Sequence, residues 1–160
     1  MDTTSGTTDE GLSPTPREAG RRPGDLQYAL VQTEQAVLRT TTGGLDVWTG
    51  EVASALGQLQ EAIEVHIELA ERPGGLNDEI RHKAPRLSSR VKRLQREHPI
   101  LHARIEELMA FLHRPGVGDK WPPDEARDDI RRLLRMVERH RQSTADAVWE
   151  AYHLDIGGVE

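Results

Sequence analysis

Cysteine is absent from all 160 residues, which excludes disulfides, thiolate metal ligands and cysteine nucleophiles. Aromatic residues are scarce at 4 %, and no segment is rich in valine, isoleucine and aromatic residues together. This composition excludes a β-sandwich or barrel and favours helices that each need only one apolar stripe. No apolar run approaches the length of a membrane span, so we expect no membrane insertion.

Export and nucleic-acid signals are also missing. Residues 1–24 lack a cationic start followed by an apolar stretch, so we expect no signal peptide and a cytoplasmic location. The net charge of −6 argues against a general nucleic-acid binder. The basic stretch from Arg81 to Arg96 leaves two interpretations open, which are charge complementarity with the acidic preceding helix and a surface for an acidic partner.

Apolar periodicity predicts an all-α protein, an up-down-up-down four-helix bundle over residues 25–155. A disordered tail rich in Thr, Ser, Gly and Pro is expected at 1–24, and a short C-terminal tail at 156–160. Asp25 and Asp124 are predicted N-caps, and Pro99 predicts a kink or bulge inside the third helix. The expected helices are Asp25–Thr40, Asp46–Arg72, Pro85–His113 and Asp124–His153, with a further short helical piece at Leu76–His82.

Three of these helices carry one histidine in the middle of an apolar seam. The seams are Val52, Leu56, Leu59, Ile63, His66 and Ala70; Leu87, Val91, Leu94, His98, Leu101, Ile105, Leu108 and Leu112; and Ala126, Ile130, Leu133, Val137, His140, Thr144 and Ala147. Steps of three and four residues keep a position on one helix face, so all three imidazoles should point inward. Converging histidines in a helix bundle suggest a metal site.

Helical rise tests whether the three histidines share a level. His98 and His140 lie about fifteen and sixteen residues from their shared turn, so both are roughly 23 Å from it at ~1.5 Å per residue. His66 precedes Pro73 by only a few residues. Its level matches only if the short helical piece at Leu76–His82 continues the second helix past the break, and we predict that it does.

Further residues are candidate ligands by spacing. His102 and Glu106 follow His98 at successive helical turns, on the same face. Glu71 follows His66 at five residues, and Glu34 on the first helix is a further carboxylate; the alternative for both is an ordinary surface charge. The sequence thus offers four histidines and three glutamates, which are His66, Glu71, His98, His102, Glu106, His140 and Glu34.

The segments containing His66 and Glu71, Glu97-His98 and His102, and Arg139-His140-Arg141-Gln142 resemble the hemerythrin-like, HHE cation-binding family. The C-terminal Glu150-Ala151-Tyr152 and Asp155 to Gly158 resemble a bacterial subgroup of it. The resemblance covers most of residues 25–155. It implies a four-helix bundle with a non-haem iron centre held by histidines and carboxylates.

This chain departs from the family's usual set of five histidines and two carboxylates, because its first helix has no histidine. One metal ion, a reduced site for two ions, and a metal-free core of histidine–glutamate hydrogen bonds all stay open. The leading function is binding of O₂ or another diatomic ligand, or sensing of redox or iron status, without enzymatic activity. The alternative is a metal-free helical interaction module with an unknown protein partner.

Overall fold

Every regular element in the described part of the chain is a helix, which confirms the predicted all-α class. The computed structural model describes residues 25–39, 43–113 and 122–153. The elements in chain order are α2 (Leu26–Leu38), α3 (Leu45–Glu71), α4 (Leu76–Lys83), the short 3-10 segment η2 (Pro85–Leu87), α5 (Ser88–Leu112) and α7 (Pro123–His153). The tails predicted at 1–24 and 156–160 lie outside the described residues.

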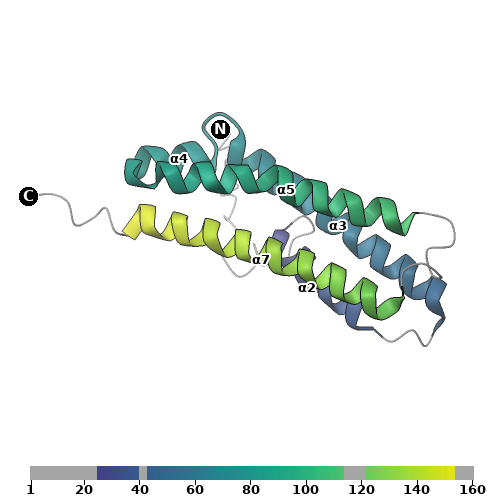
Figure 1. Cartoon of the computed structure of the whole chain (residues 1–160). Helices are drawn as coiled ribbons and strands as arrows, with labels where there is room; N and C mark the ends of the chain where they lie inside the picture. The colour runs from purple at the N-terminus through teal and green to yellow at the C-terminus, as the bar shows by residue number, and fades with distance from the viewer. Residues whose placement is uncertain (1–24, 40–42, 114–121, 154–160) are drawn as a thin grey trace, which may run out of the picture.

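The four longer helices pack along one another. α2 contacts α3 and α7, and α5 contacts the same two helices. Figure 1 shows that successive long helices run in opposite directions. The short helix α4 lies beyond the end of α3 and packs on α5 and α7. Because α2 has 13 residues whereas α3 and α7 have 27 and 31, α2 flanks only part of the length of these two helices.

Two apolar clusters fill the interior at different levels. The first joins α2, α3, α5 and α7, and it includes Ile63, Leu101 and Val137. The second joins α4, η2, the start of α5 and the end of α7; its members are Ile80, Ala84, Leu87, Val91, Leu94, Ala147 and Ala151. On α5 and α7, the histidine of the seam falls between residues of the two clusters. The fold therefore places a polar layer between two apolar ones.

The break between α3 and α4 depends on two glycines. Gly74 has a φ of 70°, a conformation that side chains with a Cβ rarely adopt. A Cβ on Gly75 would lie 2.6 Å from the carbonyl oxygen of Leu69, so no larger residue fits there. The predicted helical piece after the break is present as α4.

Asp25 is the N-cap of α2, as the sequence predicts. Its carboxylate accepts hydrogen bonds from the backbone N–H groups of Gln27 at 2.8 Å and Tyr28 at 3.2 Å. We expect Asp25→Ala to lower the free energy of unfolding by about 1 kcal/mol, because two donors at the helix start lose their acceptor. Asp25→Asn keeps an acceptor and serves as the control. Equal urea midpoints for Asp25→Ala and the wild type would contradict the role of this cap.

Two expected helix starts differ from the structure. α7 begins at Pro123, so Asp124 lies in the first turn rather than at the cap, because proline suits the first helical position. The third helix begins with η2, and its α-helical part starts at Ser88. α5 continues through Pro99 without a break, and the kink predicted there stays a prediction. Pro99 is exposed, so its ring lies on the outer face of the helix.

Candidate metal centre

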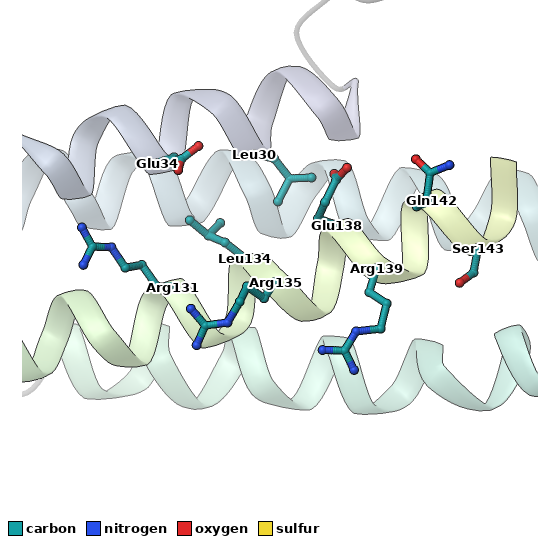
Figure 2. A pocket seen from close by; sticks show the side chains of 9 residues that line it. All are labelled: Leu30, Glu34, Arg131, Leu134, Arg135, Glu138, Arg139, Gln142 and Ser143. Atoms are coloured by element: carbon teal, nitrogen blue, oxygen red, sulfur yellow. The ribbon is translucent and has the colours of Figure 1, made fainter. Parts of the chain in front are cut away.

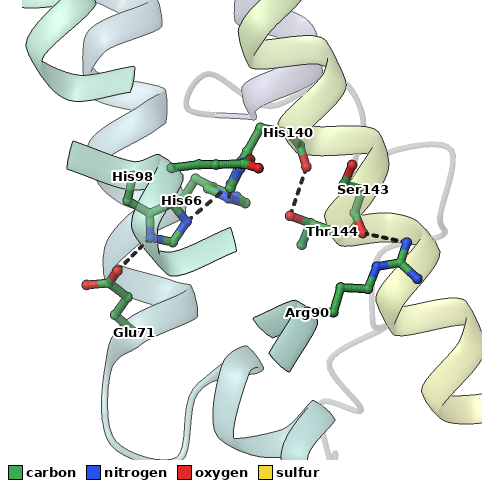
Figure 3. A network of polar contacts seen from close by, with 8 residues as sticks. His66, Glu71, Arg90, His98, His140, Ser143 and Thr144 are labelled. Carbon is green, nitrogen blue, oxygen red and sulfur yellow. Dashed lines mark hydrogen bonds and ion pairs between the residues drawn. The ribbon is translucent and has the colours of Figure 1, made fainter. Parts of the chain in front are cut away.

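Three histidines from three helices meet in the polar layer between the two apolar clusters. His66 comes from α3, His98 from α5 and His140 from α7. The Nε2 atom of His140 lies 3.0 Å from that of His66 and 3.2 Å from that of His98. Figure 3 shows the rings of His66 and His98 pointing toward His140. Within the described part of the chain, His66, His98 and His140 form the one group of candidate ligands whose atoms lie close enough together to hold a metal ion.

The rings converge by their edges rather than stacking. The ring of His66 is nearly perpendicular to those of His98 and His140, at 89° and 87°. His98 and His140 are buried, at 3 % and 2 % exposure, whereas His66 is half-buried. The predicted match of levels between His98 and His140 agrees with this geometry, and His66 joins them from α3. The three nitrogens therefore face one point.

Two glutamates hold the outer nitrogens of two of the rings. Glu71 accepts a hydrogen bond from Nδ1 of His98 at 2.6 Å, as drawn in Figure 3. Glu97 accepts one from Nδ1 of His140 at 2.7 Å. A carboxylate accepts but does not donate, so both Nδ1 atoms carry the proton. The same arrangement fixes the tautomer of metal-binding histidines in other proteins.

These proton positions create a repulsion between Nε2 of His98 and Nε2 of His140. With Nδ1 protonated, the Nε2 atom of a neutral His98 or His140 presents only a lone pair. The two lone pairs lie 3.2 Å apart in a buried setting, where their repulsion is poorly screened. A cation between the nitrogens, either a proton or a metal ion, removes the repulsion.

The surroundings disfavour the proton. Burial, followed by the proximity of His140 and His98, lowers the pKa of His66 from 6.5 to about 4. Burial also lowers the pKa of His140, and this effect outweighs the hydrogen bond to Glu97, which raises it. Neutral imidazoles with free lone pairs are the form that binds metal ions. The lowered pKa values of His66 and His140 therefore favour their neutral forms at neutral pH.

The lowered pKa of His66 predicts acid sensitivity of the metal-free protein. The unfolded chain binds a proton at this histidine below pH 6.5, whereas the folded chain does so only near pH 4. Protonation of His66 in the unfolded chain therefore costs no stability above pH 6.5. As the pH falls from 6.5 toward 4, the free energy of unfolding decreases. We expect the free energy of unfolding to decrease by about 2 kcal/mol between pH 7 and pH 5.

Urea unfolding in the presence of a chelator measures this loss at both pH values. His66→Gln removes the titrating group, so its loss of stability over the same interval should be smaller. The exposed His82, replaced by Gln, is the matched control and should retain the wild-type loss. Equal losses in the wild type and His66→Gln would contradict the assigned shift.

The other predicted ligands lie elsewhere. His102 is at the surface. Its Nε2 atom lies 3.6 Å from a carboxylate oxygen of Glu64, and its Nδ1 atom lies 3.5 Å from one of Glu106. Glu71 contacts the outer nitrogen of His98 instead of joining the three facing nitrogens. Glu34 is exposed on α2 and lines a cavity between α2 and α7 (Figure 2). The structure thus brings together His66, His98, His140 and Glu71, and it does not bring the remaining candidates to them.

Glu97 was not among the predicted site residues, although the sequence contains a signal for it. It directly precedes His98, and one residue along a helix turns the side chain by about 100°. That turn directs it from the seam of α5 toward α7, where His140 lies. The sequence signal is therefore a carboxylate next to an inward-facing histidine. Such a carboxylate can accept a hydrogen bond from the histidine of the neighbouring helix.

Two cavities reach the cluster from the surface. One of about 300 Å³ is lined by His66 and by residues at the start of α2, including Leu26. Another of about 190 Å³ is lined by His140 and Glu97. The first is large enough for a small ligand next to the least buried of the three imidazoles.

Comparisons of this chain with protein-family models, with curated proteins and with solved structures found no match. The resemblance to hemerythrin-like proteins therefore rests on the sequence segments alone. None of the described helices combines the length and apolar character that crossing a membrane requires.

Proposed function

We propose that this protein binds one divalent first-row metal ion through the Nε2 atoms of His66, His98 and His140. The observation that carries the proposal is the 3.2 Å approach of His98 and His140 while both Nδ1 atoms are engaged by glutamates. The scaffold we propose is the up-down-up-down four-helix bundle that the sequence predicts. It would hold the ligands on rigid helices between two apolar clusters.

The distances between the Nε2 atoms suit one metal ion bound between the edges of the rings. Two nitrogens bound to one zinc ion at ~2.0–2.1 Å in tetrahedral geometry lie about 3.3 Å apart. The separations of 3.0 and 3.2 Å need only small movements to match this value. Three protein ligands leave at least one coordination position open, as in reactive rather than purely structural sites.

The arrangement supports one ion rather than two. A second ion would need its own ligands, and the predicted pair His102 and Glu106 lies at the surface. Imidazole ligands suit iron, zinc, copper and nickel, so the ligand set alone does not select the metal. We propose iron because of the resemblance to hemerythrin-like proteins. Its open position would bind O₂ or another diatomic ligand, which supports a role in diatomic binding or in sensing redox or iron status.

The chain's own groups would support this role in three ways. Glu71 and Glu97 orient His98 and His140 and increase the basicity of their Nε2 atoms. The apolar clusters above and below limit access of water. The cavity at His66 provides a route for a small ligand. No described residue forms a nucleophile–base pair beside the cluster, and we propose no catalysis.

Metal content tests the proposal. The protein is purified from iron-supplemented medium, and a second sample is depleted with a chelator and titrated anaerobically with Fe(II) and, separately, Zn(II). We expect one ion per chain by elemental analysis, together with a thermal midpoint that rises with metal concentration. Two ions per chain would contradict the single-ion site.

The competing proposal is a metal-free interaction module in which a shared proton replaces the ion. The observation in its favour is the direct 3.0 Å contact between His66 and His140. It predicts no stoichiometric metal in either titration and one imidazolium in the cluster at neutral pH. Nitrogen chemical shifts of the three histidines distinguish a protonated imidazole from a neutral one.

A further inference from the structure

A second feature lies between α2 and α7, apart from the three histidines. It is a cavity of about 670 Å³, within the size range of small-molecule sites. Figure 2 shows the side chains that line it. They are Leu30, Glu34, Arg131, Leu134, Arg135, Glu138, Arg139, Gln142 and Ser143. None of the three clustered histidines is among them, so the cavity is a separate candidate site.

Three arginines of this cavity follow one another at single-turn spacing. Arg131, Arg135 and Arg139 share a stripe of α7, where like charges at this spacing repel. Within residues 25–39, 43–113 and 122–153, the side chains of these three form no recorded hydrogen bond or ion pair. Three other arginines of α7 do, since Arg127 pairs with Asp124, Arg132 with Asp129 and Arg141 with Glu138. The helix therefore tolerates a repulsion that a bound anion would relieve.

The carboxylates of the cavity do not neutralise this stripe. Glu138 accepts two hydrogen bonds from Arg141, at 2.9 and 2.7 Å, and its charge is committed there. The exposed Glu34 lines the same cavity and forms no ion pair with another described residue. The lining thus contains three arginines without an ion pair and one carboxylate that is not committed to another residue. The excess of two positive charges matches a phosphate dianion.

The wall of the cavity also has an apolar part. Leu30 and Leu134 come from the two helices and are mostly buried, at 8 % and 9 % exposure. Figure 2 shows Leu30 on α2 and Leu134 on α7, with Leu134 between Glu34 and Arg135. Such a surface favours a ligand with an apolar body beside its acidic group. Inorganic phosphate alone would leave this surface unused.

We propose that the α2–α7 cavity binds a phosphate monoester with an apolar body. The phosphate contacts the guanidinium groups of Arg135 and Arg139, which are suited to bidentate contacts with its oxygens. The apolar body lies against Leu30 and Leu134. Arg131 adds charge at the far end of the stripe, and Glu34 weakens binding by repulsion.

Calorimetric titration of the full chain with phenyl phosphate tests this site. Arg135→Gln/Arg139→Gln should weaken binding by about 10-fold or more, since hydrogen bonds to charged groups are lost. Arg132→Gln is the matched control, because it removes one charge from the same helix outside the cavity, and should bind within about 2-fold of the wild type. Glu34→Gln should bind more tightly. Inorganic phosphate and benzyl alcohol, each lacking one half of the ligand, should bind more weakly.

Methyl NMR of the wild type supplies a measurement that does not depend on the variants. Phenyl phosphate should shift the methyl signals of Leu30 and Leu134 and leave that of the distant Ile80 unchanged. The proposal is overturned if the wild type does not bind phenyl phosphate, if the signals of these leucines do not move, or if Arg132→Gln weakens binding as much as the double variant. Chelator-treated protein should give the same affinities, so failure here leaves the metal proposal intact.

Discussion

His140→Ala is expected to abolish stoichiometric metal binding. His140 is the residue at the centre of the cluster, since its Nε2 atom lies within 3.2 Å of the Nε2 atoms of both His66 and His98. Its removal leaves two ligands that no longer face a common neighbour. We expect the affinity for Fe(II) or Zn(II) to fall by more than ~100-fold, beyond the effect of losing an outer hydrogen-bond partner. Competition with a chromophoric chelator measures the change.

His102→Ala is the control for this experiment. It removes an imidazole one turn from His98 that lies at the surface beside Glu106 and Glu64. We expect this variant to keep the wild-type stoichiometry and affinity. If both variants lose the metal equally, or if His140→Ala keeps it, the three-histidine centre is wrong. His98→Ala provides a second test in case His140→Ala unfolds, and the circular dichroism spectrum of each variant establishes that it is folded.

Glu97→Gln is expected to weaken metal binding by ~10–100-fold without removing any ligand. The glutamine can still accept a hydrogen bond from Nδ1 of His140, but it lacks the charge that makes Nε2 a stronger donor to the metal. Glu71→Gln should act on His98 in the same way. The stoichiometry should stay at one ion per chain in both variants.

Glu106→Gln is the matched control for the two glutamate variants. Glu106 contacts His102 at the surface, so loss of its charge should leave the affinity within about 2-fold of the wild type. An equal decrease in Glu106→Gln would show that overall charge, rather than the hydrogen bonds to His98 and His140, sets the affinity. Unchanged affinity in Glu97→Gln and Glu71→Gln would remove the role assigned to both carboxylates.

The sequence predicted the helices and the inward histidines because both depend on periodicity. Burial of Ile63 before His66, and of Val137 before His140, follows directly from steps of three and four residues. The N-cap at Asp25 depends only on neighbouring residues, so the sequence predicted it as well. The shared level of His98 and His140 follows from helical rise and a short connection. These features need no knowledge of side-chain conformation.

The remaining parts of the site depend on distances across helices, which periodicity does not give. His102 follows His98 by one turn, but four residues advance the side chain by about 40° past a full turn. That rotation places it toward Glu64 on α3 instead of the centre. The partnership of Glu97 with His140, and of Glu71 with His98, requires the actual separation of neighbouring helices.

The basic stretch shows the same limit. One of its two interpretations was charge complementarity with the acidic residues of the preceding helix. In the structure, Arg86 and Arg90 pair instead with Glu150 near the end of α7. The sequence identified the charges but not the partner helix, because α4 intervenes between α3 and α5. This pairing accounts for part of the stretch as contacts between helices and weakens its interpretation as a surface for an acidic partner.

Anomalous X-ray diffraction from crystals of the metal-loaded protein tests the central claim most directly. It locates the ion relative to each imidazole, at the absorption edge of the metal added. The account predicts one anomalous peak per chain at about 2.0–2.1 Å from the Nε2 atoms of His66, His98 and His140, as expected for metal–imidazole bonds. A peak elsewhere, or no peak at the three histidines when the metal is supplied in excess, would contradict it.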